Sequence, residues 1–289
     1  MTIFQETPFI SIVIPALNES EFIGSCLDSV NDLDYPKNKY EIIVVDNGST
    51  DDTKSIAINR GASVFVYPEV KIGELRNLGV KESSGDIVAF VDADCIVPKS
   101  WLKAALEVLA DNSVGVVGGD CQYRQDANWI ERAWALNKGD VFCDVSSLAT
   151  GSFIIKKMVF DKVGGFNEAL IAGEDTEISQ RILDTGESLK LNSKCNVVHL
   201  GYPRTIYTFI KRQVWQTSDY LKSLKTGVDK TFFLTVVFLS SFIALVVFQI
   251  SEYKFFTIFF LSSLVCVPML GTVFRLSKSV ERISFGLFF

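Results

Sequence analysis

Short apolar runs alternate with helical stretches over the first part of the chain. The apolar, largely β-branched runs occupy residues 9–17, 40–45, 62–67, 87–91 and 114–122. Apolar residues recur at helical spacing between them, at 22–30, 73–82 and 101–110. Strands that alternate with helices of about ten residues form βαβ units. The sequence therefore predicts an α/β fold with a mostly parallel, Rossmann-like sheet.

The run at 87–91 ends in two carboxylates, Asp92 and Asp94, with only Ala93 between them. Open α/β sheets bind ligands at the carboxyl ends of their strands. Two adjacent carboxylates repel each other unless a cation or hydrogen-bond donors are present. Right-handed crossovers would bring Asn18 and Asp46, which end two other strands, to the same edge. A polar turn that caps the strand explains the tripeptide alone equally well.

Composition excludes several functional classes. The chain has 289 residues, enough for one large domain or two small ones, and a net charge of −6, which argues against a nucleic-acid partner. Its six cysteines contain no CxxC pair, which favours a reducing compartment over a zinc site or a disulfide framework. The first 15 residues lack the basic start and apolar centre of a signal peptide.

The C-terminal part has the pattern of a membrane module. Residues 231–250 and 255–274 carry no charge, and each run is long enough to span a hydrocarbon core of about 30 Å. The connector 251–254 requires a helical hairpin, and Lys and Arg on both flanks predict that the flanks are cytoplasmic. Buried helices of a soluble domain are the alternative. We expect a multi-pass protein of the cell (inner) membrane with its catalytic domain facing the cytoplasm.

Residues 205–230 join the two parts. Apolar residues at helical spacing are interspersed with lysines, the composition of a helix that lies on an anionic membrane surface. An ordinary helix packed on the domain is the alternative. The expected organisation is a catalytic domain at 1–204, an amphipathic interfacial segment at 205–230 and a membrane region at 231–289.

Six motifs then identify a family. They are SIVIPALNES (11–20), IIVVDNGSTDDT (42–53), RNLGV (76–80), GDIVAFVDADC (85–95), GGFNE (164–168) and GEDTEISQR (173–181). In this order they resemble a family 2 glycosyltransferase with the GT-A fold. The resemblance implies an inverting hexosyltransferase that takes a sugar from a nucleoside diphosphate, UDP or GDP.

The family chemistry needs a divalent cation to neutralise the leaving diphosphate. The resemblance implies that Asp94 ligates Mn²⁺ or Mg²⁺ and that Asp92 lies near the ribose or contacts the metal through water. Ala93 belongs to the same donor-binding segment. His199 matches a further metal ligand of many relatives, and a histidine favours Mn²⁺.

The acceptor hydroxyl needs a carboxylate that takes its proton. By resemblance this general base is Asp175, and Glu174 helps to position the acceptor. Without the resemblance, favourable electrostatics at a helix N-terminus explain either carboxylate.

The nucleotide must be held so that the anomeric carbon faces the acceptor. By resemblance the loop after the first strand lines the base and ribose with Pro15, Ala16, Asn18 and Glu19. Asp46 matches the residue that hydrogen-bonds the base. Arg76 is expected to reach the base or the phosphates, with a solvated helix position as the alternative.

Processive members of the family carry a QxxRW sequence, which the local KRQVWQ (211–216) does not match. Arg212 and Trp215 lie in roughly the corresponding place and are expected to border the site on the acceptor side. Two spans are also few for an extrusion channel, so we predict a non-processive enzyme that transfers one sugar.

The acceptor is predicted to be a lipid or a lipid-linked glycan, because the tail keeps the site near the bilayer. A polyprenyl-phosphate sugar synthase is an open alternative. A nucleotidyltransferase would share the sheet and the metal carboxylates, but its loop is usually Gly-rich and basic, unlike PALNES (15–20). A non-catalytic assembly subunit is opposed by the presence of every candidate carboxylate.

Overall fold

The computed structural model describes residues 7–135 and 139–216, which lie in the first of two units, Met1–Asp219. The strands are β1 (Ile10–Ala16), β2 (Tyr40–Asp46), β3 (Ser63–Val66), β4 (Ile87–Phe90), β5 (Cys95–Ile96), β6 (Val114–Gly118), β7 (Cys121–Tyr123), β8 (Phe142–Asp144), β9 (Phe153–Lys156), β10 (Ser188–Asn192) and β11 (Val197–His199). The α-helices are α1 (Ile23–Asn31), α2 (Thr53–Asn59), α3 (Ile72–Lys81), α4 (Trp101–Leu109), α5 (Trp129–Trp134), α6 (Lys157–Val163), α7 (Glu174–Asp184) and α8 (Ile206–Gln216). Short 3₁₀ turns are η1 (Lys37–Lys39), η2 (Thr150–Ser152) and η3 (Ser193–Cys195).

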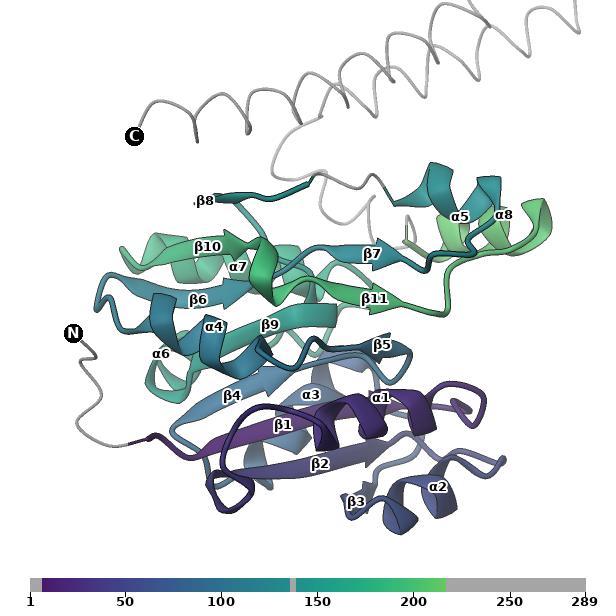
Figure 1. The fold of residues 1–289 in the computed structure, drawn as a ribbon, viewed down its shortest axis with the longest axis horizontal. Helices are drawn as coiled ribbons and strands as arrows, with labels where there is room; N and C mark the ends of the chain where they lie inside the picture. Colours follow the sequence, from purple (N-terminus) through teal and green to yellow (C-terminus); the bar gives the residue numbers. More distant parts are fainter. Residues whose placement is uncertain (1–6, 136–138, 217–289) are drawn as a thin grey trace, which may run out of the picture. The chain divides into compact units, whose positions relative to one another are not determined.

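The main sheet has eight strands in the order β3-β2-β1-β4-β9-β6-β10-β8 (Figure 1). β9 runs antiparallel to both of its neighbours and β8 runs antiparallel to β10, while the other pairs are parallel. The predicted α/β fold with a mostly parallel sheet is therefore confirmed. A second sheet of three short strands, β5-β11-β7, lies beside it.

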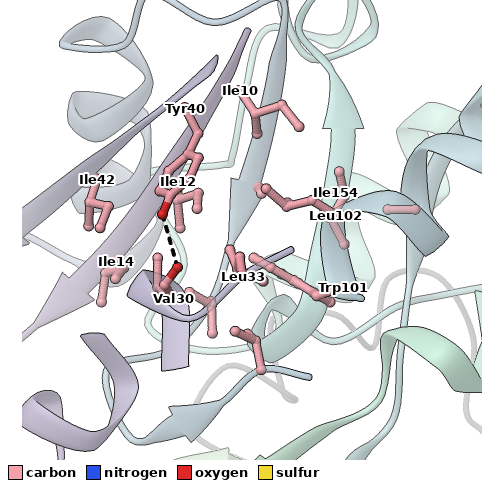
Figure 2. Packing of buried hydrophobic residues seen from close by; sticks show 14 of the residues in the cluster. Ile10, Ile12, Ile14, Val30, Leu33, Tyr40, Ile42, Trp101, Leu102 and Ile154 are labelled. Atoms are coloured by element: carbon pink, nitrogen blue, oxygen red, sulfur yellow. Dashed lines mark hydrogen bonds between the residues drawn. The ribbon is translucent and has the colours of Figure 1, made fainter. Parts of the chain in front are cut away.

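Two hydrophobic layers cover the two faces of the main sheet. Alternate residues of β1 point to opposite faces, so Ile12 packs with α1 and α4 whereas Val13 packs with α3, α6 and α7. Figure 2 shows the first layer, in which the Tyr40 hydroxyl donates a hydrogen bond to the Val30 carbonyl over 3.2 Å. With apolar layers on both faces, the open edge at the carboxyl strand ends is the place for polar groups.

Three parallel strands bring their polar ends to that edge. Ala16 at the end of β1 pairs with Asp46 at the end of β2, and Val13 pairs with Phe90 at the end of β4. The edge predicted from the crossover rule is thus formed by the loops that carry Asn18, Asp46 and Asp92.

Three predicted elements differ from the structure. The run 114–122 divides into β6 and β7, which belong to different sheets, because Gly118 and Gly119 lie directly against the backbone of Ser152 and Cys195. The apolar residues of 189–200 also predict a single strand, but this range divides into β10, η3 and β11. Apolar residues on one side of 127–138 predict a helix over that range, but the helix is limited to α5, and residues 136–138 lie outside the described part.

Within 7–135 and 139–216, none of the helices is both long enough and apolar enough to cross a membrane. The predicted spans at 231–250 and 255–274, and the part of the interfacial segment beyond 216, lie outside the described residues.

Candidate active site

An open cavity of about 850 Å³ lies at the carboxyl ends of the strands. Twelve of the fourteen residues singled out in the sequence line it: Pro15, Ala16, Glu19, Arg76, Asp92, Ala93, Asp94, Glu174, Asp175, His199, Arg212 and Trp215. These residues come from the first strand loop, α3, the end of β4, α7, β11 and α8, so the fold brings distant segments to one place. Asn18 and Asp46 are not among the lining residues.

Asp94 and His199 meet on one wall of the cavity. β11 pairs with β5 so that His199 lies opposite Cys95, which places the imidazole beside Asp94. The Asp94 Oδ2 to His199 Nε2 distance is 3.5 Å. The Cys95 thiol belongs to the same cluster, since one donor atom from each of the three residues lies within 4.8 Å of the others. Gly201 is required here, because a Cβ at that position would overlap Asp94 Oδ2.

The chemistry of this wall fits a divalent cation. Burial lowers the pKa of His199, so the ring is neutral and offers a nitrogen lone pair. Its Nδ1 is buried and finds no hydrogen-bond partner among the described residues. Carboxylate oxygen and imidazole nitrogen together suit Mn²⁺. The wall therefore has the donor atoms that the implied metal needs.

Three carboxyl groups gather around the same wall. Burial, followed by the nearby Asp94 and Asp92, raises the pKa of Glu19 to about 8. Burial also raises the pKa of Asp94. A raised carboxyl pKa means that the negative charge is poorly stabilised by the surrounding protein. The site therefore favours the uptake of a proton or a cation.

Arg76 lies between two carboxylates rather than in solvent. Its Nη2 donates to Asp92 Oδ1 over 2.9 Å, and its Nη1 donates to Glu174 Oε1 over 2.6 Å. The residue is only 3% exposed. The alternative of a solvated helix position is therefore wrong. The expected contact of the guanidinium with the donor stays a prediction, and in this structure the group is paired with protein carboxylates.

Asp175 also lines the cavity, in the first turn of α7. Gly173 precedes the helix with a φ of 80°, a left-handed conformation that glycine adopts without strain. Burial, together with the neighbouring Glu174, raises the pKa of Asp175 to about 6. One of its oxygens accepts from the Thr176 backbone N–H over 2.7 Å. A carboxylate with this pKa is suited to take a proton near neutral pH.

Asp46 and Asn18 organise the loops behind the cavity. Asp46 Oδ1 accepts the backbone N–H groups of Gly48 and Ser49, while its buried Oδ2 is unpaired within the described part of the chain. Asn18 has a φ of 54°, and its side chain accepts from the Thr50 N–H over 2.9 Å. Both residues thus fix the conformation of the loops that follow β1 and β2.

Arg212 and Trp215 approach the cavity from α8. The Arg212 Nη1 donates to the Gly201 carbonyl over 2.9 Å, and its Nη2 lies 3.4 Å from His199 Nε2. The guanidinium is therefore close to the Asp94–His199 wall and supplies positive charge there. Both residues border the cavity, as the sequence predicted.

Several lining residues were not predicted. The Tyr202 ring stacks on His199 with centroids 4.2 Å apart, and its hydroxyl donates to the Cys121 carbonyl. Asn47 exchanges two hydrogen bonds with the backbone of Val70. No periodicity marks Tyr202 or Asn47, although Asn47 lies within the motif 42–53 and Tyr202 follows the predicted ligand His199 by three positions.

The model of the family "Glycosyl transferase family 2" matches residues 11–163. The chain belongs to this family. The match covers β1 to α6 and includes the segment of Asp92 and Asp94. It supports the prediction that the chain is an enzyme of the transferase class.

The relatives extend this result. The chain is 34% identical over 194 residues to "Glycosyltransferase AglE" of Haloferax volcanii, over 63% of this chain and 64% of that protein. It is 25% identical over 247 residues to a "Dolichyl N-acetyl-alpha-D-glucosaminyl phosphate 3-beta-D-2,3-diacetamido-2,3-dideoxy-beta-D-glucuronosyltransferase" of Methanococcus voltae, over 78% and 75%. The chain thus spans less than two thirds of AglE, and two further relatives are spanned for 49% and 40% of their lengths.

The structural neighbours agree on the GT-A-like fold. A mannosyltransferase from Pyrobaculum calidifontis, solved in complex with GDP-Man and Mn²⁺, superposes with a TM-score of 0.62 over 98% of this chain and 84% of its own, at 18% identity. TarS of S. aureus in complex with UDP-GlcNAc superposes with a TM-score of 0.54 over 65% and 57%, at 22% identity.

Proposed function

We propose that this protein is a metal-dependent, inverting glycosyltransferase of the hexosyltransferase type. It moves one sugar from a UDP- or GDP-linked donor to a lipid or lipid-linked glycan. The observation that carries the proposal is the cavity itself. It is lined by Asp94 and His199, whose donor atoms suit a divalent cation, and by Asp175, whose raised pKa suits a base. The named activities of the family relatives support the same reaction class.

Several charged residues of the cavity have a role in the proposed reaction. Asp175 takes the proton of the acceptor hydroxyl, whose oxygen bonds to the anomeric carbon as the bond from that carbon to the diphosphate oxygen breaks. The electron pair of the broken bond leaves with the diphosphate. A divalent cation held by Asp94 and His199 would neutralise that charge. Arg212 adds positive charge to the same wall.

The donor lies along the strand ends in this proposal. The loop with Pro15, Ala16 and Glu19 lines the ribose side, and Asp92 faces the same region. In the metal-free site the pKa of Glu19 is about 8, so its carboxyl group can hold a proton near neutral pH and donate a hydrogen bond to a ribose hydroxyl. Asp46 is fully buried and does not line the cavity, so its proposed hydrogen bond to the base needs the loop after β2 to uncover its unpaired Oδ2.

The acceptor is proposed to be a hydroxyl group rather than a phosphate. A phosphate acceptor is already ionised at neutral pH and gains little from a base. The raised pKa of Asp175 favours the acceptor class that does need one. The relative of Methanococcus voltae, whose name includes a dolichyl phosphate-linked sugar, supports a lipid-linked acceptor.

Membrane attachment is part of the proposal. Ile206, Tyr207 and Ile210 of α8 are 59%, 75% and 55% exposed, while Arg212 of the same helix lines the cavity. An apolar surface beside the cavity is typical of a helix that lies on a lipid bilayer. Together with the uncharged runs 231–250 and 255–274, it supports a multi-pass protein with its catalytic domain on the cytoplasmic side and a single transfer per acceptor.

A donor screen tests the proposal. The full chain, purified in detergent, is incubated with UDP- and GDP-linked hexoses and Mn²⁺ or Mg²⁺, with and without a cellular lipid extract. We expect release of UDP or GDP that depends on the metal and rises with the extract. Release of pyrophosphate instead would favour a nucleotidyltransferase, and binding of a nucleotide sugar without any turnover would favour a non-catalytic subunit.

A further inference from the structure

The guanidinium of Arg76 joins two parts of the cavity wall that come from distant segments. Its two terminal nitrogens bond to Asp92, at the end of β4, and to Glu174, at the start of α7, over 2.9 and 2.6 Å. Arg76 and Glu174 are nearly inaccessible, with 3% and 8% of their side-chain surfaces exposed, whereas Asp92 keeps 31%. The guanidinium is a planar fork of N–H donors. Because it is buried between the two carboxylates, it fixes the direction of both.

The surroundings of Arg76 hold this fork in place. Its guanidinium lies over the Phe166 ring, 5.6 Å from the ring centre. The next residue, Asn77, ties α3 to the loop before α7, because its amide donates to the Phe166 carbonyl over 2.9 Å and accepts the Phe166 N–H over 2.8 Å. Both polar residues of the RNLGV motif therefore serve to connect α3 with the approach to α7.

The pairing also divides the two carboxylates at the start of α7. The Glu174 carboxylate is buried and bonds to Arg76. The hydrogen bonds given for the Asp175 carboxylate within the described residues come from its neighbour Thr176. With Glu174 held on α3, the following residue is directed to the cavity. The arrangement thus links the direction of Asp175 to that of Asp92 through one cation.

We propose that Arg76 is a positioning residue that fixes the donor side of the cavity, through Asp92, and the acceptor side, through Glu174, relative to each other. The inference rests on the proposed function, since it takes Asp92 as a donor-side group and Asp175 as the base. It assigns Arg76 a role on the protein's own carboxylates instead of a contact with the nucleotide.

Two substitutions separate this role from a general loss of stability. Arg76→Met removes the fork while keeping most of the buried stem, and Glu174→Gln removes one of its partners. Binding of UDP and of GDP with Mn²⁺ is measured by titration calorimetry on the full chain in detergent, beside kcat for nucleotide-sugar turnover. We expect Arg76→Met to weaken binding of the preferred nucleotide about tenfold and to lower kcat about 100-fold. Glu174→Gln should lower kcat by a similar factor and leave nucleotide binding within about twofold.

A matched control is Arg181→Met. Arg181 also makes an ion pair on α7, with Glu177 over 2.6 Å, and bonds to the Val163 carbonyl, but it does not line the cavity. This variant should lose thermal stability and keep both nucleotide binding and kcat. If Arg76→Met does not accumulate as folded protein, Arg76→Lys replaces it, because an ammonium keeps the charge without the fork and should still weaken binding and lower kcat.

The possible results are distinguishable. Folded Arg76→Met that binds nucleotide and turns over as the wild type does would overturn the inference and leave the proposed function intact. A wild-type chain that binds neither UDP nor GDP with Mn²⁺ and turns over no nucleotide sugar would overturn both.

Discussion

Replacing the Asp175 carboxylate by an amide should lower activity but raise stability, because the protein environment raises the pKa of this group. Its pKa is about 6 in the folded protein and 3.8 ordinarily, so the folded state holds the proton more tightly than the unfolded chain does. The stability that the proton provides is complete below pH 4 and is lost as the pH rises through about 6. Asp175→Asn should therefore raise the free energy of unfolding at pH 7.5, by up to about 3 kcal/mol.

The same substitution should abolish most transfer activity. In the wild type, kcat/KM should fall about tenfold per pH unit below pH 6, as the base becomes protonated. The measurements are pH–rate profiles for both proteins and denaturant unfolding at pH 4 and 7.5. A near-normal rate for Asp175→Asn would contradict the general-base mechanism and favour a phosphate acceptor.

Asp94 carries the second prediction at this scale. Asp94→Asn removes a charged oxygen from the pair with His199 and should weaken Mn²⁺ binding by more than about tenfold, measured by calorimetry without nucleotide. Asp161→Asn is the control, since the Asp161 side chain is paired with Lys157 on the surface and does not line the cavity. Full metal-dependent activity in Asp94→Ala would exclude Asp94 as a metal ligand.

The sequence located most single residues of the cavity but not their partners. Asp92, Asp94 and Asp175 follow from motifs that mark strand and helix ends. The pairing of Arg76 with Glu174 joins residues 98 positions apart, and neither lies in a pattern that predicts the other. Only the packing of α3 against the start of α7 creates that contact, so it could not be predicted from local sequence.

At the scale of elements, α3 depends on one close approach to the sheet. A Cβ at Gly79 would overlap Val13 Cγ1 and would lie 2.7 Å from Val45 Cγ2, both from the strands beneath the helix. Gly79→Ala should therefore push α3 outward and cost about 1–3 kcal/mol of stability, measured by denaturant unfolding. Because α3 carries Arg76, kcat should fall as well.

Gly24→Ala provides the comparison, because Gly24 is also helical but a Cβ there meets only the flexible end of the Arg60 side chain, at 3.1 Å. That variant should be as stable as the wild type or slightly more so, since alanine favours the helix. Equal stability of the two alanine variants would show that α3 does not need the close approach.

The elements that were predicted least well are those that leave the main sheet. The runs 114–122 and 189–200 read as single strands because their apolar residues are continuous. Each contributes one strand to the main sheet and a short strand to the β5-β11-β7 sheet. Strand length and apolar content predict that a strand exists, but not which sheet it joins, because strand pairing depends on distant residues. The turn between β10 and β11 is nevertheless what brings His199 to Asp94.

At the scale of the whole molecule, the proposed membrane hairpin predicts on which side of a membrane each of its flanks lies. If 231–250 and 255–274 span the bilayer, the connector 251–254 lies on the side opposite both flanks. Single cysteines at Lys230 and Arg275 should then be protected from a membrane-impermeant maleimide in intact cells and become reactive after lysis. A cysteine at Ser251 should react in intact cells. Reaction of all three without lysis would contradict a hairpin, and reaction at Lys230 and Arg275 alone would place the catalytic domain outside. Protection of Lys230→Cys and Arg275→Cys in intact cells would place the catalytic domain in the cytoplasm. A reducing cytoplasm would also account for the free thiols of Cys26, Cys95 and Cys195.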